Sequence, residues 1–144
     1  MHTYINPPGF TKILGSYSHG ISIDVGDSQM IFVTGQIAMD ESGNAVAPDD
    51  IGKQTEYVFQ NIQTILAEDG ASLDDVVRVV IYVTDMSKFP QISAVRNKYL
   101  AVSKPASTLV QIQKTVKEGC DIEIEVTAIK KISSGVELRS RRHT

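Results

Sequence analysis

The sequence contains a single cysteine and lacks a long apolar run. Cys120 cannot form a disulfide within the chain, so we expect a reducing, cytoplasmic environment. No apolar stretch approaches the ~20 residues that a membrane-spanning helix needs. The segment Met1–Tyr4 has neither the basic start nor the apolar block of a signal peptide. These absences argue against a membrane partner.

Metal and cofactor motifs are also missing. The histidines His2, His19 and His143 are scattered, and together with one cysteine they offer no spacing typical of a metal site. Neither a glycine-rich phosphate loop nor a Gly-x-Ser-x-Gly motif occurs. The net charge of −3 argues against nucleic-acid binding, which usually needs a basic face. We therefore expect no metal site and no nucleic-acid partner.

Length and composition fit one globular domain. The chain has 144 residues, of which 42% are hydrophobic and 22% are charged. We assign the domain to residues 1–132. Residues 133–144 carry three arginines against one glutamate and show no apolar periodicity. We interpret them as a disordered tail or a cloning remnant, with a binding arm as the alternative.

The first predicted helix has clear ends. Asp49 or Asp50 can cap its N-terminus, and it runs to about Glu68 and stops at Asp69–Gly70. Its apolar residues follow spacings of three and four, which predicts one buried face. These residues are Ile51, Val58, Ile62, Ile65 and Leu66, with Thr55 on the same stripe.

The second predicted helix starts at Ser87, whose side chain can cap it. Pro90 is tolerated because it falls in the first turn. The segment Ser103–Pro105 ends the helix. Its expected apolar stripe consists of Phe89, Ile92, Val95 and Tyr99.

The remaining elements are predicted strands. The first 20 residues are rich in proline, glycine and serine and are expected to be mostly loop. The first two strands form a hairpin, and the last two are expected to form another around Lys117–Gly119. The strands are His19–Val25, Met30–Gly35, Val76–Val83, Thr108–Val116 and Ile122–Ile129.

The order ββ-α-β-α-ββ predicts an α+β domain with one mixed sheet. Two helices cover only one face of that sheet. The opposite face keeps apolar residues from several strands. A small domain with such an uncovered face is expected to form an oligomer.

Two carboxylates in the last strand are candidates for chemistry. Glu123 and Glu125 lie on one face, about 7 Å apart by strand rise. Such a pair suits acid–base catalysis if one group is desolvated while the other stays ionised. The alternative is that both are solvent-facing charges.

Three polar segments are candidate binding elements. Tyr17 and His19 share a loop that forms either a cradle for a small polar ligand or an ordinary capped turn. The segment Thr34–Gly35 ends a strand, where the glycine permits close approach of a ligand or marks a bulge. The pair Ser107–Thr108 begins a strand, and its hydroxyl and N–H groups suit a carboxylate ligand or an ST-turn.

Five segments together resemble the Rid (reactive intermediate deaminase, or YjgF) family, in the family's order and spacing over about residues 13–131. The Thr-Gly-Gln block and the Ile-Glu-Ile-Glu ending are the most specific. The segments are Gly15–His19, Phe32–Ile37, Arg78–Met86, Lys104–Thr108 and Ile122–Val126.

The resemblance implies a chorismate-mutase-like fold and a homotrimer. In that arrangement the three sheets pack into a central barrel, the helices lie outside, and each ligand cleft lies between two subunits. Active members of the family hydrolyse enamines and imines to a 2-oxo acid and ammonia without a cofactor.

The resemblance also suggests site residues. Tyr17 matches the family's site tyrosine, and Thr34 and Gly35 match its hydroxyl residue and the following glycine. Glu123 matches the glutamate thought to place the attacking water. The family's Pro-Ala-Arg-Ser motif is Pro-Ala-Ser-Thr here, so Ser107 replaces the arginine that clamps the substrate carboxylate.

Two further positions depart from the family pattern. Leu109 replaces a cysteine, and Ser93 replaces a common helix asparagine. Arg96 lies one helical turn beyond Ser93 and either reaches the cleft or is a solvated helix arginine. A serine offers one neutral hydrogen bond in place of a bidentate ionic contact, which lowers affinity for a short 2-imino acid.

These residues predict a protein that hydrolyses an imine, an enamine or a related reactive metabolite. Glu123 would place water, and Tyr17 and Thr34 would position a substrate different from the usual 2-imino acids. The alternative is a non-catalytic trimer that binds a small metabolite for a regulatory purpose. A ribonuclease or translation-inhibitor role fits poorly with the acidic composition and the missing basic patch.

Overall fold

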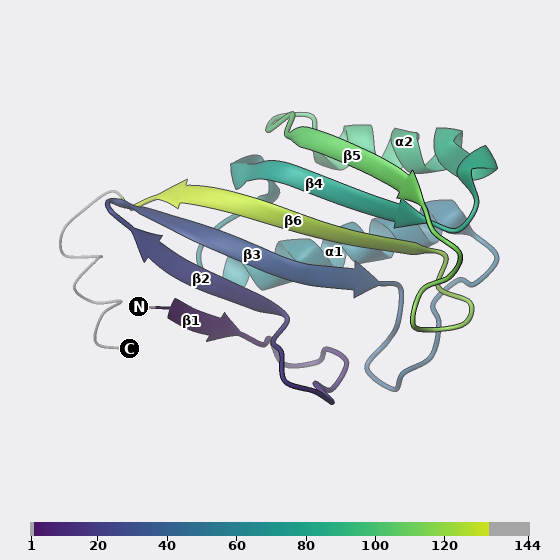
Figure 1. Cartoon of the computed structure of the whole chain (residues 1–144), viewed down its shortest axis with the longest axis horizontal. Helices are drawn as coiled ribbons and strands as arrows, with labels where there is room; N and C mark the ends of the chain where they lie inside the picture. Colours follow the sequence, from purple (N-terminus) through teal and green to yellow (C-terminus); the bar gives the residue numbers. More distant parts are fainter. Residues whose placement is uncertain (1, 133–144) are drawn as a thin grey trace.

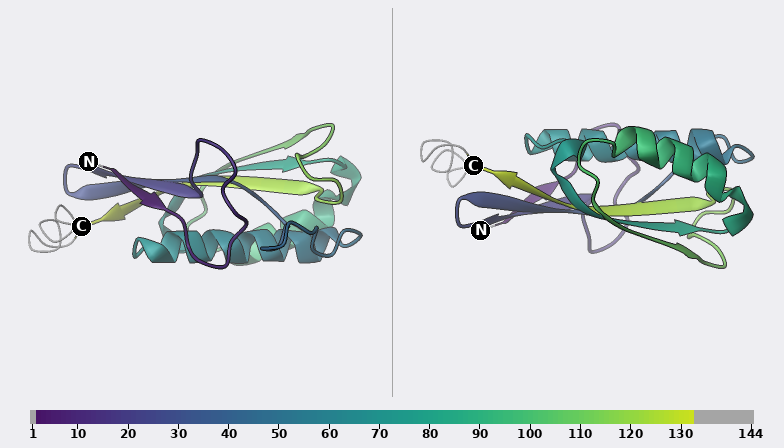
Figure 2. Two further views of the ribbon diagram at one scale, coloured as in Figure 1. Left: turned by 90° about the horizontal axis from the view of Figure 1, so that it is seen from below. Right: turned by 90° about the horizontal axis from the view of Figure 1, so that it is seen from above.

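The computed structural model of the chain describes residues 2–132, which form a six-stranded mixed sheet with two α-helices on one face (Figures 1 and 2). This confirms the predicted fold class. The predicted tail, residues 133–144, lies outside the described residues. The strands are β1 (His2–Ile5), β2 (Gly20–Val25), β3 (Ser28–Ile37), β4 (Val76–Val83), β5 (Ala106–Gln111) and β6 (Ile122–Lys131). The helices are α1 (Ile51–Glu68) and α2 (Phe89–Tyr99), with short 3-10 turns at Leu73–Asp75 and Met86–Lys88.

The strand order is β1-β2-β3-β6-β4-β5. The predicted β2–β3 hairpin is confirmed, but the predicted hairpin of the last two strands is wrong. Strand β6 enters the middle of the sheet and pairs antiparallel with both β3 and β4. Strand β5 lies beyond β4 and is parallel to it. Inside the sheet β6 pairs along both of its edges, whereas at the end of a terminal hairpin it would leave one edge unpaired (Figure 1).

The bounds of several strands also differ from the prediction, most clearly at β1 and β5. Strand β1 lies in the segment expected to be loop, where it forms the sheet edge against β2. Strand β5 ends at Gln111, although the prediction extended it to Val116. Beyond Ile112, whose N–H donates to the Val83 carbonyl, the chain leaves the sheet and crosses to β6.

Helix α1 follows the predicted pattern. The Asp50 carboxylate accepts a hydrogen bond from the Lys53 N–H at 3.0 Å, which caps the first turn. The helix ends at Glu68 with Asp69 as its C-cap, and Gly70 follows with a φ of 73°, a conformation that glycine adopts without steric cost. All six residues of the predicted stripe are buried against the sheet.

Helix α2 starts differently from the prediction. Ser87 does not cap it; the Asp85 carboxylate instead accepts hydrogen bonds from the Ser87 N–H and hydroxyl in the preceding 3-10 turn. Pro90 lies in the first helical turn, as expected. Of the predicted stripe, Ile92 is fully buried and Phe89 stays 38% exposed. The Val95 and Tyr99 side chains are partly buried against the core.

The sheet has two different faces. The face under the helices carries the core residues of β6, which are Ile122, Ile124, Val126 and Ala128. The outer face carries Glu123 and Glu125 together with exposed apolar side chains. Exposed apolar residues on this face, each 40–53% exposed, include Val25, Phe32, Val110 and Ile129. No helix within residues 2–132 is both long and apolar enough to span a membrane.

One buried polar side chain ties α1 to the loop before β6. Gln54 is fully buried, and its amide nitrogen donates to the Val46 carbonyl at 3.0 Å and to the Gly119 carbonyl at 2.7 Å. Its amide oxygen accepts the Asp121 N–H at 3.0 Å. Three backbone groups therefore depend on one side chain, and Asp121 immediately precedes the strand that carries Glu123.

We predict that Gln54→Leu destabilises the protein by about 3 kcal/mol, because a side chain of similar size leaves three buried backbone groups unpaired. Urea unfolding at neutral pH measures this change in the free energy of unfolding. Gln63→Leu, at an exposed position of the same helix, should change it by less than about 0.5 kcal/mol. Equal effects of the two substitutions would contradict the structural role of Gln54.

Candidate functional site

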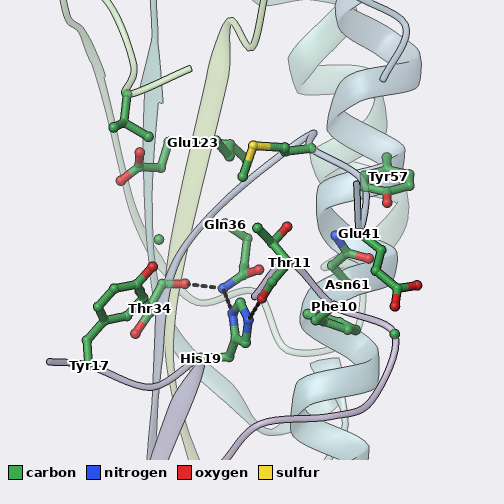
Figure 3. Close-up of a pocket in the computed structure, with 15 residues that line it drawn as sticks. Phe10, Thr11, Tyr17, His19, Thr34, Gln36, Glu41, Tyr57, Asn61 and Glu123 are labelled. Atoms are coloured by element: carbon green, nitrogen blue, oxygen red, sulfur yellow. Dashed lines mark hydrogen bonds between the residues drawn. The ribbon is translucent and has the colours of Figure 1, made fainter. Parts of the chain in front are cut away.

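A cavity of about 120 Å³ lies at the end of β3, between the loop of residues 9–19 and helix α1 (Figure 3). Four of the predicted site residues, Tyr17, Thr34, Gly35 and Glu123, line it. The cavity is smaller than the ~300–1,000 Å³ typical of pockets for drug-sized ligands. It therefore suits a ligand of a few heavy atoms. The further lining side chains include Phe10, Thr11, Gln36, Glu41, Tyr57 and Asn61.

A β-bulge shapes this end of β3. Val33 pairs with Val126 and Gln36 pairs with Ile124, so two residues of β3 oppose Glu125 alone. The two residues of the bulge are Thr34 and Gly35. Bulges bend a strand and redirect its side chains. Here the bulge interrupts the alternation of buried and exposed residues and brings Thr34 and Gly35 to the cavity.

Gly35 gives room to the Glu123 carboxyl group. A Cβ atom at position 35 would lie 2.9 Å from the Glu123 Cδ and closer still to its Oε2. Real side chains do not approach this closely, so any larger residue would push the carboxyl group away. The sequence left open whether Gly35 marks a bulge or permits a close approach. The glycine belongs to a bulge, and its missing side chain also permits the close approach of the Glu123 carboxyl group.

Glu123 is partly buried and forms no hydrogen bond with the other described residues. Burial raises the pKa of its carboxyl group above the ordinary value, and the nearby negative charge of Glu125 raises it further. A carboxyl group with a raised pKa holds and exchanges a proton closer to neutral pH than an ordinary glutamate does.

Glu125 lies in a different environment on the same face. Its Oε1 accepts the Tyr82 hydroxyl at 2.5 Å, and this hydrogen bond is the main reason why the pKa of Tyr82 is raised. Arg78, on strand β4 like Tyr82, donates to the Thr108 hydroxyl at 3.2 Å. The two glutamates thus differ, because one has a hydroxyl partner and the other faces the cavity without one.

A hydrogen-bond network holds the loop of residues 9–19 against the bulge (Figure 3). The Gln36 amide nitrogen donates to the Thr34 carbonyl at 2.9 Å and contacts His19 Nδ1 at 3.4 Å. His19 Nε2 lies 3.0 Å from the Thr11 carbonyl. A carbonyl only accepts and this amide nitrogen only donates, so the two contacts fit the tautomer of His19 that carries its hydrogen on Nε2. Both ring nitrogens are engaged, which assigns buried His19 a structural role.

Thr34 and Tyr17 present polar groups to the cavity. The Thr34 hydroxyl donates to the Ser18 carbonyl at 2.6 Å, which leaves its oxygen lone pairs free to accept a hydrogen bond. Tyr17 is 55% exposed, and Figure 3 shows it beside Thr34, on the side of the cavity away from α1. The arrangement can bind a small polar molecule and exchange a proton with it through Glu123.

The other predicted site residues lie elsewhere in the chain. Ser107 lines a second cavity, at the start of β5 and beside α2. The Ser93 hydroxyl accepts hydrogen bonds from Arg96 and Asn97 on α2. Thr108 contacts Arg78 on the outer face. None of Ser93, Ser107 and Thr108 lines the cavity of Glu123.

Sequence analysis missed the roles of Gln36, Tyr57 and Asn61. Gln36 stands in the Thr-Gly-Gln block, but nothing in that block indicates that it links Thr34 to His19. Tyr57 and Asn61 lie four residues apart on α1, and this spacing was the available indication that they share one face. Residues 2–132 contain no group of three or more His, Cys, Asp or Glu side chains that could hold a metal ion.

A mixed sheet with both helices on one face and a small acidic cavity at a central bulge defines a class of small α+β proteins. The model of the family Ribonuc_L-PSP, described as Endoribonuclease L-PSP, matches residues 11–130. A RutC family protein of Pyrococcus abyssi is 39% identical over 118 residues, which cover 82% of this chain and 87% of the relative. The chain belongs to this family, also known as YjgF or Rid.

Solved structures agree with this assignment. Yeast Mmf1 superimposes with a TM-score of 0.80 at 30% identity, covering 91% of this chain and 100% of that chain. YyfA of Yersinia pestis, a protein of the Rid family, superimposes with a TM-score of 0.78 at 28% identity, covering 89% and 98%.

We predict that Glu123→Gln makes the protein more stable at neutral pH. The raised pKa means that the folded state binds this proton more tightly than the unfolded chain does. Ionised Glu123 therefore destabilises the fold at pH values above its raised pKa, and this penalty disappears below the ordinary carboxyl pKa of about 4.3. Thermal unfolding of both proteins from pH 4 to pH 8 measures the difference.

The expected gain in melting temperature is largest at pH 8 and vanishes near pH 4. Glu118→Gln is the control, because Glu118 is an exposed carboxylate in the loop before β6; it should show no such pH dependence. A Glu123→Gln protein that is less stable than the parent at pH 8 would contradict a desolvated Glu123.

Proposed function

We propose that the protein hydrolyses a small imine, or an enamine after tautomerisation, to a carbonyl compound and ammonia. The observation that carries this proposal is the Glu123 carboxyl group, which has a raised pKa and lies against Gly35 in a cavity sized for a small ligand. Imine hydrolysis needs a group that first gives and then takes a proton, and a pKa shifted toward neutral favours both steps. Membership of the Rid family supports the same reaction class.

The chemistry balances with one carboxyl group and one water molecule. Protonated Glu123 donates its proton to the imine nitrogen, which makes the carbon electrophilic. The carboxylate then accepts a proton from water as the water oxygen bonds to that carbon. In the resulting carbinolamine, Glu123 protonates the amino nitrogen and accepts the hydroxyl proton while the C–N bond breaks. Ammonia leaves, a C=O bond forms, and Glu123 regains its starting protonation state.

Tyr17 and Thr34 are the proposed positioning residues. The Thr34 oxygen can accept a hydrogen bond from the imine N–H or from the water, because its own proton is donated to Ser18. Tyr17 offers a hydroxyl group that forms no hydrogen bond with the other described residues. Together they supply one acceptor and one donor, which suffices to orient a ligand of a few atoms.

We propose further that three subunits form the active protein. Apolar side chains on four strands of the outer face, with Phe32 and Ile129 at its centre, have no cover within residues 2–132. A symmetric trimer would bury this face. It would also reduce the exposure of Tyr17 and complete the site with residues of a second subunit, in agreement with the arrangement that the family resemblance implies.

A non-catalytic metabolite-binding trimer is the second candidate, because the strand arginine of the family is replaced by Ser107. The family model carries an endoribonuclease description. The net charge of −3 does not favour a polyanionic substrate.

The test of the enzyme is the release of carbonyl product from imines generated in situ by an amino-acid oxidase or a dehydratase, with substrates that carry or lack a carboxylate. We predict acceleration over buffer for the parent protein. Glu123→Gln should lower the rate by about a hundredfold or more, because it removes the proton-transfer group.

Gly35→Ala should cause a similar loss by displacing the Glu123 carboxyl group. Gly52→Ala is the matched control: a Cβ there meets only an ordinary contact in α1, so activity should be unchanged and stability slightly higher. If the parent protein accelerates none of the imines, the deaminase proposal is wrong, and calorimetric titration with 2-oxo acids then tests the metabolite-binding candidate.

The mass of the protein in solution tests the proposed trimer. Light scattering coupled to size-exclusion chromatography should give three times the chain mass of 15.7 kDa. Phe32→Glu should produce monomers, because it places a charge within the proposed interface. Val102→Glu, in an exposed turn after α2, should leave the mass unchanged. A monomeric parent protein would exclude a site shared between subunits.

A further inference from the structure

The outer face of the sheet carries a polar cluster that has no part in the proposed reaction steps. It consists of Arg78 and Tyr82 on β4, Thr108 on β5 and Glu125 on β6. Glu125 leaves the same face of β6 as Glu123, about 7 Å away by strand rise. The cluster therefore lies beside the carboxyl group that lines the candidate site.

Tyr82 connects the two glutamates. In the strand register it lies directly opposite Glu123, while Val80 lies opposite Glu125. Its hydroxyl nevertheless donates along the diagonal, to Glu125 Oε1 at 2.5 Å. An aromatic side chain is long enough to span such a diagonal. The phenol side chain therefore starts beside Glu123, and its hydroxyl holds the carboxylate of Glu125.

The hydrogen bond between Tyr82 and Glu125 is short, and both side chains are partly buried. Hydrogen bonds to an ionised acceptor are shorter and stronger than those between neutral groups. An exposed glutamate samples many rotamers, whereas this contact holds the Glu125 side chain in one of them. The negative charge of Glu125 consequently has a fixed place on the outer face, close to Glu123.

No other charged group within residues 2–132 cancels this effect. Arg78 donates to the Thr108 hydroxyl at 3.2 Å and forms no ion pair with either glutamate. Strands β3 and β5 contain no charged residue. Apart from burial, the charge of Glu125 is the cause that raises the pKa of Glu123. The other titratable residues that line the cavity of Glu123 are Tyr17, His19, Glu41 and Tyr57.

We propose that Glu125 is a positioning residue for the reaction of Glu123: its carboxylate, fixed by the Tyr82 hydroxyl, keeps a proton on Glu123 until the imine arrives. Two like charges on one face repel each other, and a proton on one carboxyl group relieves this repulsion. Because the Tyr82 hydroxyl already serves Glu125, Glu123 is the member of the pair that holds the proton. Glu123 then begins the cycle as an acid, as protonation of an imine requires.

Glu125 touches neither the substrate nor the water in this scheme and acts only through Glu123. Its role in imine hydrolysis rests on the proposed function. The coupling between the two carboxyl groups stands by itself and is measurable without a substrate.

The test follows the side-chain carboxyl carbon of Glu123 in the full chain by carbon-13 NMR from pH 4 to pH 8. Glu125→Gln removes the negative charge, while its amide oxygen can still accept the Tyr82 hydroxyl. The titration midpoint of Glu123 should move to lower pH, because a like charge no longer opposes its ionisation. Tyr82→Phe should move the midpoint in the same direction by a smaller amount, since Glu125 keeps its charge but loses its fixed place.

Two matched controls and one double variant make this measurement specific. Glu118→Gln removes a carboxylate from the exposed loop before β6, and Tyr4→Phe removes an exposed hydroxyl from β1. Both should leave the midpoint of Glu123 unchanged. Tyr82→Phe should have no further effect once Glu125→Gln is present, because Tyr82 acts through Glu125. Equal midpoints in the parent protein and Glu125→Gln would overturn the proposal, as would a Tyr82→Phe effect that persists in full without Glu125.

The pH profile of turnover supplies the second readout. At pH values above the midpoint of Glu123, Glu125→Gln should lower kcat for imine hydrolysis by about three- to tenfold, because less Glu123 is then protonated. Below the midpoint, kcat should equal that of the parent protein. KM should stay unchanged at both pH values, since Glu125 does not touch the substrate.

The two readouts separate this proposal from the enzymatic one. If imines are hydrolysed with the same pH profile by the parent protein and Glu125→Gln, the enzyme stands and the positioning role is wrong. If the midpoint of Glu123 moves as expected and no imine is hydrolysed, the coupling of the two carboxyl groups stands and the enzyme is wrong.

Discussion

The position of the Glu123 carboxyl group depends on the absence of a side chain at Gly35. Gly35 has no Cβ, and the bulge at Thr34 and Gly35 turns this empty position toward β6. The carboxyl group can therefore lie against the β3 backbone and lose part of its hydration. Desolvation is the largest cause of its raised pKa. The strand irregularity, the glycine and the acid–base property of one carboxyl group are thus a single physical feature of the molecule.

Glu125, the neighbouring glutamate, lies in surroundings that differ from those of Glu123. Both side chains leave the same face of β6, but the Tyr82 hydroxyl donates to Glu125 and no described group donates to Glu123. Different surroundings separate the protonation behaviour of two carboxyl groups that would be equivalent in an ideal strand. Tyr82 lies on β4, so this separation exists only because β6 is inserted between β3 and β4.

The sequence predicted the features that depend on local periodicity. The stripe of α1, its cap by Asp49 or Asp50 and the alternation of β6 each involve residues within a few positions, and all were confirmed, with Asp50 as the cap. The predicted β5–β6 hairpin was wrong. A short loop between two strands suggests that they pair with each other, but β6 instead pairs along its two edges with β3 and β4. The contacts of Gln54 join residues 65 and 67 positions apart, and no local pattern indicates them.

The candidate site was predictable in part for the same reason. The resemblance named Tyr17, Thr34, Gly35 and Glu123, and the structure brings these four to one cavity. It did not indicate why His19 and Gln36 accompany them, because a hydrogen-bond network that uses both imidazole nitrogens depends on the loop conformation. Ser107 was recognised as a departure, but the cavity it shares with Arg96 required the relative placement of α2 and β5.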